Sequence, residues 1–79
     1  MQSREFLINT VDKVKKFNWL ASECVENVDI SRGRYVVDAA SILGIFSLDL
    51  SWPVTVTIHT DDLDRADRFF SEVEETLRG

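Results

Sequence analysis

A chain of 79 residues, 44% of them hydrophobic and 29% charged, has the composition of one folded domain and is too rich in apolar side chains for a disordered segment. Its formal net charge of −5 argues against nucleic-acid binding and against docking on an anionic membrane. We therefore expect a single domain over residues 1–79 with neither of these partners.

The cysteine count and the N-terminus indicate the compartment. Cys24 is the only cysteine, whereas a small secreted scaffold normally carries an even set of cysteines as disulfides. Residues 1–5 become charged at once, and the sequence has no run long and apolar enough for a signal peptide or a membrane-spanning helix. These features predict a cytoplasmic protein.

The chain opens with a predicted strand and a predicted helix. Residues 4–10 are expected to form the strand, in which Phe6 and Ile8 alternate with polar neighbours. In the helix that follows, apolar residues recur at spacings of three and four, which places them on one face. These residues are Val11, Val14, Phe17, Ala21 and Cys24.

A hairpin and a short helix come next. Residues 25–31 and 34–39 predict two strands joined at Gly33, because glycine adopts the positive φ that a tight turn needs. Ser41 then precedes an apolar helix from Ile42 to about Leu48. Serine is a good N-cap, since its hydroxyl oxygen accepts a hydrogen bond from a free amide of the first turn.

The last two elements have the clearest patterns. Residues 53–59 predict a strand with Val54, Val56 and Ile58 on one face and Thr55, Thr57 and His59 on the other. A long amphipathic helix should run from about Asp62 to Arg78. Its expected buried stripe consists of Leu63, Ala66, Phe70, Val73 and Leu77.

The element order βαββαβα predicts an α+β fold: a four-stranded antiparallel sheet with its helices on one face. The other face is then left open to water, which explains the polar alternates of the last strand.

Chemistry-bearing residues are few and isolated. His59, the only histidine, has neither a cysteine nor a carboxylate at a ligand-like spacing, so we interpret it as a solvated surface residue. Cys24 is interpreted as a buried structural thiol at the end of a helix. The lysines Lys13, Lys15 and Lys16 and the acidic run of the last helix are interpreted as solvated faces. We therefore expect no catalysis, no cofactor and no metal.

The short helix is the exception. It places five large apolar residues in about two turns: Ile42, Leu43, Ile45, Phe46 and Leu48. A surface helix buries only part of its circumference, and contiguous exposed apolar surface usually marks a binding site. The alternative is that Trp19 or Trp52 covers these residues and the helix is core.

At this segment the sequence resembles a family. Ser41-Ile42-Leu43-Gly44-Ile45-Phe46-Ser47-Leu48 is similar to the regulatory-serine helix of HPr, the histidine phosphocarrier of the bacterial sugar phosphotransferase system. The opening Arg4-Glu5-Phe6, the closing strand and helix, and the element order also fit. The resemblance covers nearly the whole chain and implies the family's open-faced β-sandwich.

The sequence departs from the family at its active site. There the first strand is followed by Gly-Ile/Leu-His-x-Arg-Pro-Ala, whose histidine carries the phosphoryl group. Here the equivalent stretch is Asn9-Thr10-Val11-Asp12-Lys13-Val14-Lys15-Lys16-Phe17, which has no histidine. His59 lies on another strand and another face, so no catalytic residue is carried over. The resemblance carries over Ser41 as a regulatory phosphosite, and Ile42, Leu43 and Phe46 as a partner-contact patch.

Four interpretations follow. In the first, the chain is a degenerate HPr-like protein of a bacterial cytoplasm that binds a protein partner through Ile42, Leu43 and Phe46. In the second, it is a phosphotransferase-linked regulator switched by phosphorylation of Ser41. In the third, it is an enzyme of another class. In the fourth, it is a small structural domain or an obligate homodimer formed through the open sheet face.

Overall fold

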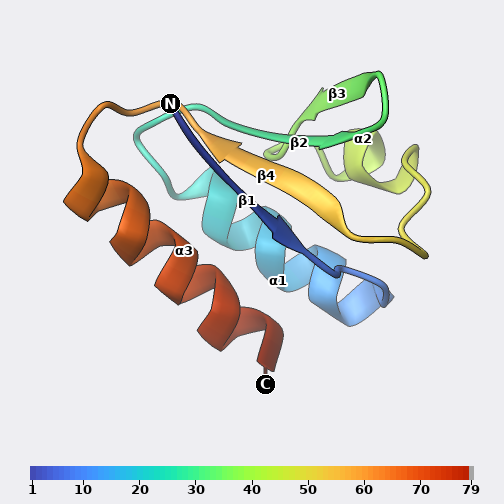
Figure 1. Ribbon diagram of the computed structural model, residues 1–79. Helices are drawn as coiled ribbons and strands as arrows, with labels where there is room; N and C mark the ends of the chain where they lie inside the picture. Colours follow the sequence, from blue (N-terminus) through green and yellow to red (C-terminus); the bar gives the residue numbers. More distant parts are fainter. Residues whose placement is uncertain (79) are drawn as a thin grey trace.

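Seven elements follow one another in the predicted order (Figure 1). The computed structural model describes residues 1–78. The elements are β1 (Gln2–Phe6), α1 (Val11–Ser22), β2 (Val28–Arg32), β3 (Tyr35–Asp38), α2 (Ile42–Phe46), β4 (Val54–Ile58) and α3 (Leu63–Arg78).

The four strands form one antiparallel sheet in the order β1-β4-β2-β3. β4 is central: Val56 lies opposite Arg4 of β1 on one side and opposite Ile30 of β2 on the other. The helices lie on one side of this sheet, with α1 beside α3 and α2 beneath β3 (Figure 1). The predicted α+β fold with a four-stranded antiparallel sheet is confirmed.

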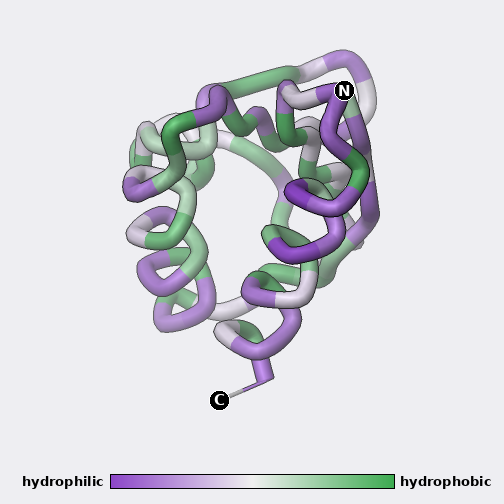
Figure 2. Tube along the Cα trace, turned by 90° about the vertical axis from the view of Figure 1, so that its left-hand side faces the viewer, coloured by the Kyte–Doolittle hydropathy of each residue, from purple (hydrophilic) through white to green (hydrophobic). Residues whose placement is uncertain are grey.

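The core lies between the sheet and the helices. β4 buries the side chains of Val54, Val56 and Ile58, while Thr55 and Thr57 lie on the open face and remain partly exposed. Along the helices, hydrophobic and hydrophilic residues alternate around the turns, as Figure 2 shows. The helical residues that complete the core are Val14, Phe17, Ala21, Ile45, Ala66, Phe69, Phe70 and Val73.

The first strand is shorter and earlier than residues 4–10, the range expected from the pattern. Its ladder with β4 ends at the pair Phe6–Val54, and the chain then leaves the sheet to reach α1. Ile8 is nevertheless fully buried. The alternation that suggested a longer strand therefore reflects a core contact made by a connecting segment.

The hairpin strands are also shorter than expected. β2 begins only at Val28, and Val25, three residues earlier, is 97% exposed. The turn between the two strands consists of Gly33 and Arg34. Gly33 has a φ of 60° and is the only residue of the described chain with a positive φ. Glycine at the first central position fits a type II′ hairpin turn.

Both long helices bury their middles rather than their ends. Val11 and Leu63, at the first positions of α1 and α3, are 59% and 61% exposed, and their predicted burial is wrong. Cys24 lies beyond the end of α1 and is only half-buried. Leu77 is also partly buried, whereas Phe69, outside the predicted stripe, is fully buried. Terminal side chains project past the sheet, so periodicity overestimates their burial.

Candidate functional site

The helix α2 begins on a serine cap. The hydroxyl oxygen of Ser41 accepts a hydrogen bond from the amide of Gly44 at 3.2 Å, and its carbonyl accepts one from Ile45 at 3.0 Å. A Cβ at Gly44 would lie 3.3 Å from Cβ of Val37. The absence of a side chain at Gly44 thus lets α2 approach β3 closely.

The apolar residues of α2 divide into a buried and an exposed set. Ile45 is fully buried and Leu48 nearly so, which anchors the helix to the core. Leu43 is 79% exposed and Phe46 43% exposed, while Ile42 is partly buried against the core. We call Leu43 and Phe46 the α2 patch. The predicted contact patch thus keeps two exposed members, Leu43 and Phe46, and Ile42 borders it.

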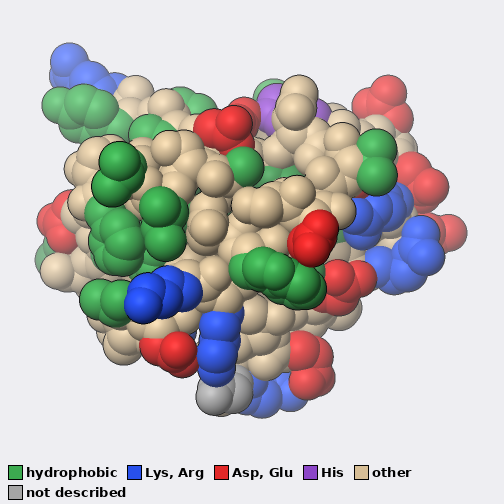
Figure 3. Space-filling model, turned by 180° about the vertical axis from the view of Figure 1, so that it is seen from behind, with side chains coloured by type: hydrophobic (Ala, Val, Ile, Leu, Met, Phe, Trp, Pro, Cys, Tyr) green, Lys and Arg blue, Asp and Glu red, His purple; other side chains and the backbone are tan. Residues whose placement is uncertain are grey.

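The tryptophans do not bury the α2 patch, since Leu43 is 79% and Phe46 43% exposed. Trp19 and Trp52 are themselves 64% and 57% exposed, and the guanidinium of Arg32 lies 5.8 Å from the ring centre of Trp52. Seen from behind, hydrophobic side chains gather on the side of the molecule that carries α2 (Figure 3). Leu43 and Phe46 therefore present apolar surface to solvent on a face that also holds cationic groups.

The start of α1 is closed by local polar contacts. Thr10 caps the helix by accepting a hydrogen bond from the amide of Lys13 at 3.1 Å, and the ammonium of Lys13 lies 3.4 Å from the side-chain oxygen of Asn9. Lys16 pairs with Asp12 at 3.2 Å. These groups form an exposed, self-paired helix start, and none of them is an imidazole.

His59 lies on the open face of the sheet, away from α1. Its Nε2 is 2.6 Å from a carboxylate oxygen of Asp29 on β2. The pairing of Asp29 with Thr57 places this carboxylate next to His59, so the antiparallel register, not sequence spacing, makes the contact. The predicted surface position of His59 agrees with the structure, but its Asp29 partner was not predicted.

Cys24 belongs to a small polar cluster that joins two helices. The guanidinium of Arg65 donates to both carboxylate oxygens of Glu26, at 3.0 and 3.1 Å, and lies 3.6 Å from Sγ of Cys24. Burial raises the pKa of the Cys24 thiol, which Arg65 only partly opposes. The hydrogen bonds from Arg65 lower the pKa of Glu26. The cluster fastens the segment after α1 to the first turns of α3 and leaves Cys24 a protonated thiol.

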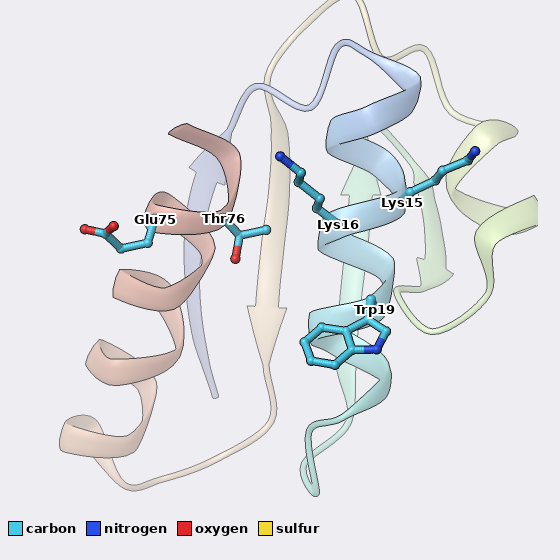
Figure 4. Close-up of a pocket in the computed structure, with 5 residues that line it drawn as sticks. All are labelled: Lys15, Lys16, Trp19, Glu75 and Thr76. Carbon is cyan, nitrogen blue, oxygen red and sulfur yellow. The ribbon is translucent and has the colours of Figure 1, made fainter. Parts of the chain in front are cut away.

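An open groove of about 500 Å³ lies between α1 and α3 (Figure 4). Its lining residues are Lys15, Lys16, Trp19, Glu75 and Thr76. Charges of both signs line it, and Lys16 is already paired with Asp12. Within the described part of the chain, no group of three or more His, Cys, Asp or Glu side chains could hold a metal ion.

Comparison with known proteins gives the fold. No protein-family model and no curated protein matches the sequence. Among solved structures, HPr-C-His from Thermoanaerobacter tengcongensis superimposes with a TM-score of 0.77 at 22% identity, over 100% of this chain and 98% of that one. The chain has the HPr-like fold. A histidine-containing phosphocarrier protein described from Mycoplasma gives a TM-score of 0.69 at 14% identity, over 96% and 97% of the two chains.

The HPr-like fold accounts for the arrangement of the sheet and the three helices. At these identities the similarity extends to the fold alone, so the roles of the site residues rest on the geometry of the site itself. Over residues 1–78, no helix is long and apolar enough to cross a membrane.

Proposed function

We propose that this chain is a non-catalytic, HPr-like regulatory or adaptor module of a bacterial cytoplasm. It binds a protein partner through the α2 patch, Leu43 and Phe46, with Ser41 and Ile42 at its border. It does not carry a phosphoryl group on histidine. The relation to phosphotransferase phosphocarriers rests on the shared fold and on the resemblance of residues 41–48.

The exposure of Leu43 and Phe46 carries this proposal. A five-residue helix needs tertiary anchoring, which Ile45 supplies, but it gains nothing from the surface that Leu43 and Phe46 leave exposed to water. Covering apolar surface contributes about 25 cal/mol per Å². A partner that covers both side chains would gain this free energy, and buried aromatic side chains are frequent anchors of protein interfaces.

The start of α1 supports the second half of the proposal. In the family that the sequence resembles, the phosphorylated histidine follows the first strand. Here Asn9 and Thr10 occupy that place, and Thr10 is engaged as the helix cap. His59 lies across the sheet, bonded to Asp29. A phosphoryl donor docked at the start of α1 would find no acceptor imidazole there.

Partner capture with matched variants tests the contact role. We expect a partner protein captured from the native host by the wild type, and then purified and identified, to bind Leu43→Asp and Phe46→Asp at least tenfold more weakly, since a charge must then be desolvated in an apolar contact. Val25→Asp is the control, because Val25 is 97% exposed outside this surface. Equal binding by all four proteins would contradict the proposal.

A switched version of the same function is the second candidate, favoured by the position of Ser41. Its exposed hydroxyl caps α2 directly beside the patch. A phosphate there would add about −1.5 to −2 charges at a helix N-terminus, which the fold tolerates, but beside a surface that must lose water to bind. An HPr serine kinase with ATP should then modify Ser41 and not Ser47. An unmodified Ser41, with partner binding indifferent to Ser41→Asp, would leave a constitutive binding module.

A further inference from the structure

The strand β3 forms a free edge of the sheet. It pairs with β2 on one side only, since the strand order ends at β3. The amide of Ala39 donates to the carbonyl of Val28 at 2.9 Å, in the same register as the ladder. Hydrogen-bonded pairs alternate along an antiparallel ladder. Val37 and Tyr35 therefore bond β2, whereas the peptide groups of Val36 and the amide of Asp38 point away from the sheet. The carbonyl of Asp38 already accepts a hydrogen bond from the Ser41 amide at 3.0 Å.

This edge has little protection against pairing. β3 contains no lysine, no proline and no bulge, and only its length of four residues and the charge of Asp38 oppose pairing. Tyr35 is 68% exposed and Val36 64% exposed. An accessible, apolar, unpaired strand is a template for another strand.

The charges at the two ends of β3 have no ion-pair partners. No carboxylate lies within 4 Å of the Arg34 guanidinium, and no cation within 4 Å of the Asp38 carboxylate, among residues 1–78. Asp38 also stands directly opposite Asp29 on the neighbouring strand. Like charges at opposed positions are unfavourable, so an additional cation near Asp38 would be stabilising.

We propose that β3 pairs with β3 of a second copy of this chain, antiparallel and centred on Val36. In this register Val36 faces Val36, and each Arg34 faces the partner's Asp38. The two Val36 residues exchange their outward backbone hydrogen bonds across the two-fold axis, so the sheet continues as eight strands, while Arg34 and Asp38 meet through their side chains. Neighbouring registers place Arg34 opposite Val36, or Val36 opposite Asp38, and leave the charges unpaired.

The association is weak, because a four-residue edge buries far less surface than a standard interface. The association uses β3 rather than the α2 patch, so its test does not depend on whether the proposed function is correct. Concentration and charge complementarity control it, and both can be varied.

Charge reversal tests the register. Arg34→Asp puts Asp opposite Asp38, and Asp38→Arg puts Arg opposite Arg34, so each variant alone should dimerise about tenfold more weakly than the wild type. In an equimolar mixture every Asp faces an Arg, and the hetero-pair should recover wild-type association. Sedimentation equilibrium from about 10 μM to 1 mM covers the range of weak association.

Controls separate this register from other contacts. Arg68→Asp makes the same charge change as Arg34→Asp on an exposed part of α3 and should dimerise as the wild type does. If Asp38→Arg fails to fold, because Asp38 also accepts a hydrogen bond from the Ala40 amide, Val36→Lys replaces it and should abolish association by placing lysine against lysine. A wild type that stays monomeric at about 1 mM overturns the proposal. A dimer whose association does not change in Arg34→Asp also overturns it, because such a dimer would form through another surface, such as the open face of the sheet.

Discussion

The helices α1 and α2 begin alike and then differ. Each starts on a hydroxyl cap, Thr10 for α1 and Ser41 for α2, with hydrogen bonds of 3.1 and 3.2 Å to the third amide of the helix. After Thr10 comes the exposed Val11 and then mainly charged or buried residues, whereas the residues after Ser41 are apolar and several are exposed. The same capping device therefore serves two different surfaces.

The difference lies in what each helix buries. α1 has 12 residues and inserts Val14, Phe17 and Ala21 into the core. α2 has five residues and fully buries only Ile45. α1 thus contributes mainly to folding, while α2 leaves Leu43 and part of Phe46 exposed. This contrast is what makes α2 the candidate contact element.

Two phenylalanines give the largest expected contrast. Phe17 is fully buried, so Phe17→Ala should lower the free energy of unfolding by about 3–5 kcal/mol. Phe46 is 43% exposed, and Phe46→Ala should cost about 1 kcal/mol or less. Urea unfolding followed by circular dichroism measures both. Equal losses would mean that Phe46 belongs to the core and that the contrast between the helices is wrong.

The ion pair between Glu26 and Arg65, which follows the end of α1, should have an intermediate effect on the free energy of unfolding. Glu26→Gln removes a charged pair with Arg65 that is about three-quarters buried and should cost about 1–2 kcal/mol near pH 7. Because the pKa of Glu26 is lowered in the folded state, the pair stabilises above the ordinary glutamate value of 4.5 and its contribution disappears as the pH falls below the lowered value.

The difference between wild type and Glu26→Gln should therefore shrink on acidification from about pH 7 to about pH 3. Glu75→Gln is the matched control, since the ion pair of Glu75 with Arg78 is largely exposed and should matter little. A gap that stays constant with pH would show that Glu26 acts without its charge.

The caps should give a smaller and equal effect. Thr10→Ala and Ser41→Ala each remove one hydrogen bond to a helix amide and should each cost about 1 kcal/mol, measured by thermal unfolding. Ser41→Asp should retain the cap, because aspartate accepts the same bond. Ser71→Ala, at an exposed position of α3, serves as the reference. A loss at Thr10 but none at Ser41 would indicate that α2 is held by Ile45 alone.

The smallest effect on stability is expected at Leu43. With 79% of the side chain exposed, Leu43→Asp should change the free energy of unfolding by no more than about 0.5 kcal/mol. Ile45→Asp, two residues away and fully buried, should prevent folding, because a charge would enter the core. A marked loss of stability in Leu43→Asp would remove Leu43 from the α2 patch.

The fold was predictable where the residue pattern and the burial coincide. Val54, Val56 and Ile58 alternate in sequence because β4 has one buried and one open face. The first strand was predicted to extend too far because Ile8, a buried residue in a connecting segment, alternates with polar neighbours as a strand residue does. Phe69 was missed because the helical stripe is wide enough to bury two adjacent phenylalanines.

The candidate site was only partly predictable, because exposure depends on tertiary contacts. Five large apolar residues on a short helix indicate that some are exposed, but not that Ile45 is buried and Leu43 is not. Likewise, only the register between β2 and β4 brings Asp29 to His59. The sequence could have signalled the free edge of β3, since Tyr35, Val36 and Val37 follow a tight turn with no lysine or proline among them.

The central claim is that this HPr-like chain contacts proteins through α2 and accepts no phosphoryl group at α1 or at His59. Incubation with phosphoenolpyruvate and the general phosphotransferase enzyme, followed by intact-mass measurement under alkaline conditions, tests it directly, with a histidine-containing HPr as the positive control. The account predicts no change in mass for this chain while the control gains one phosphate. A stoichiometric gain of one phosphate that disappears in His59→Gln would contradict it.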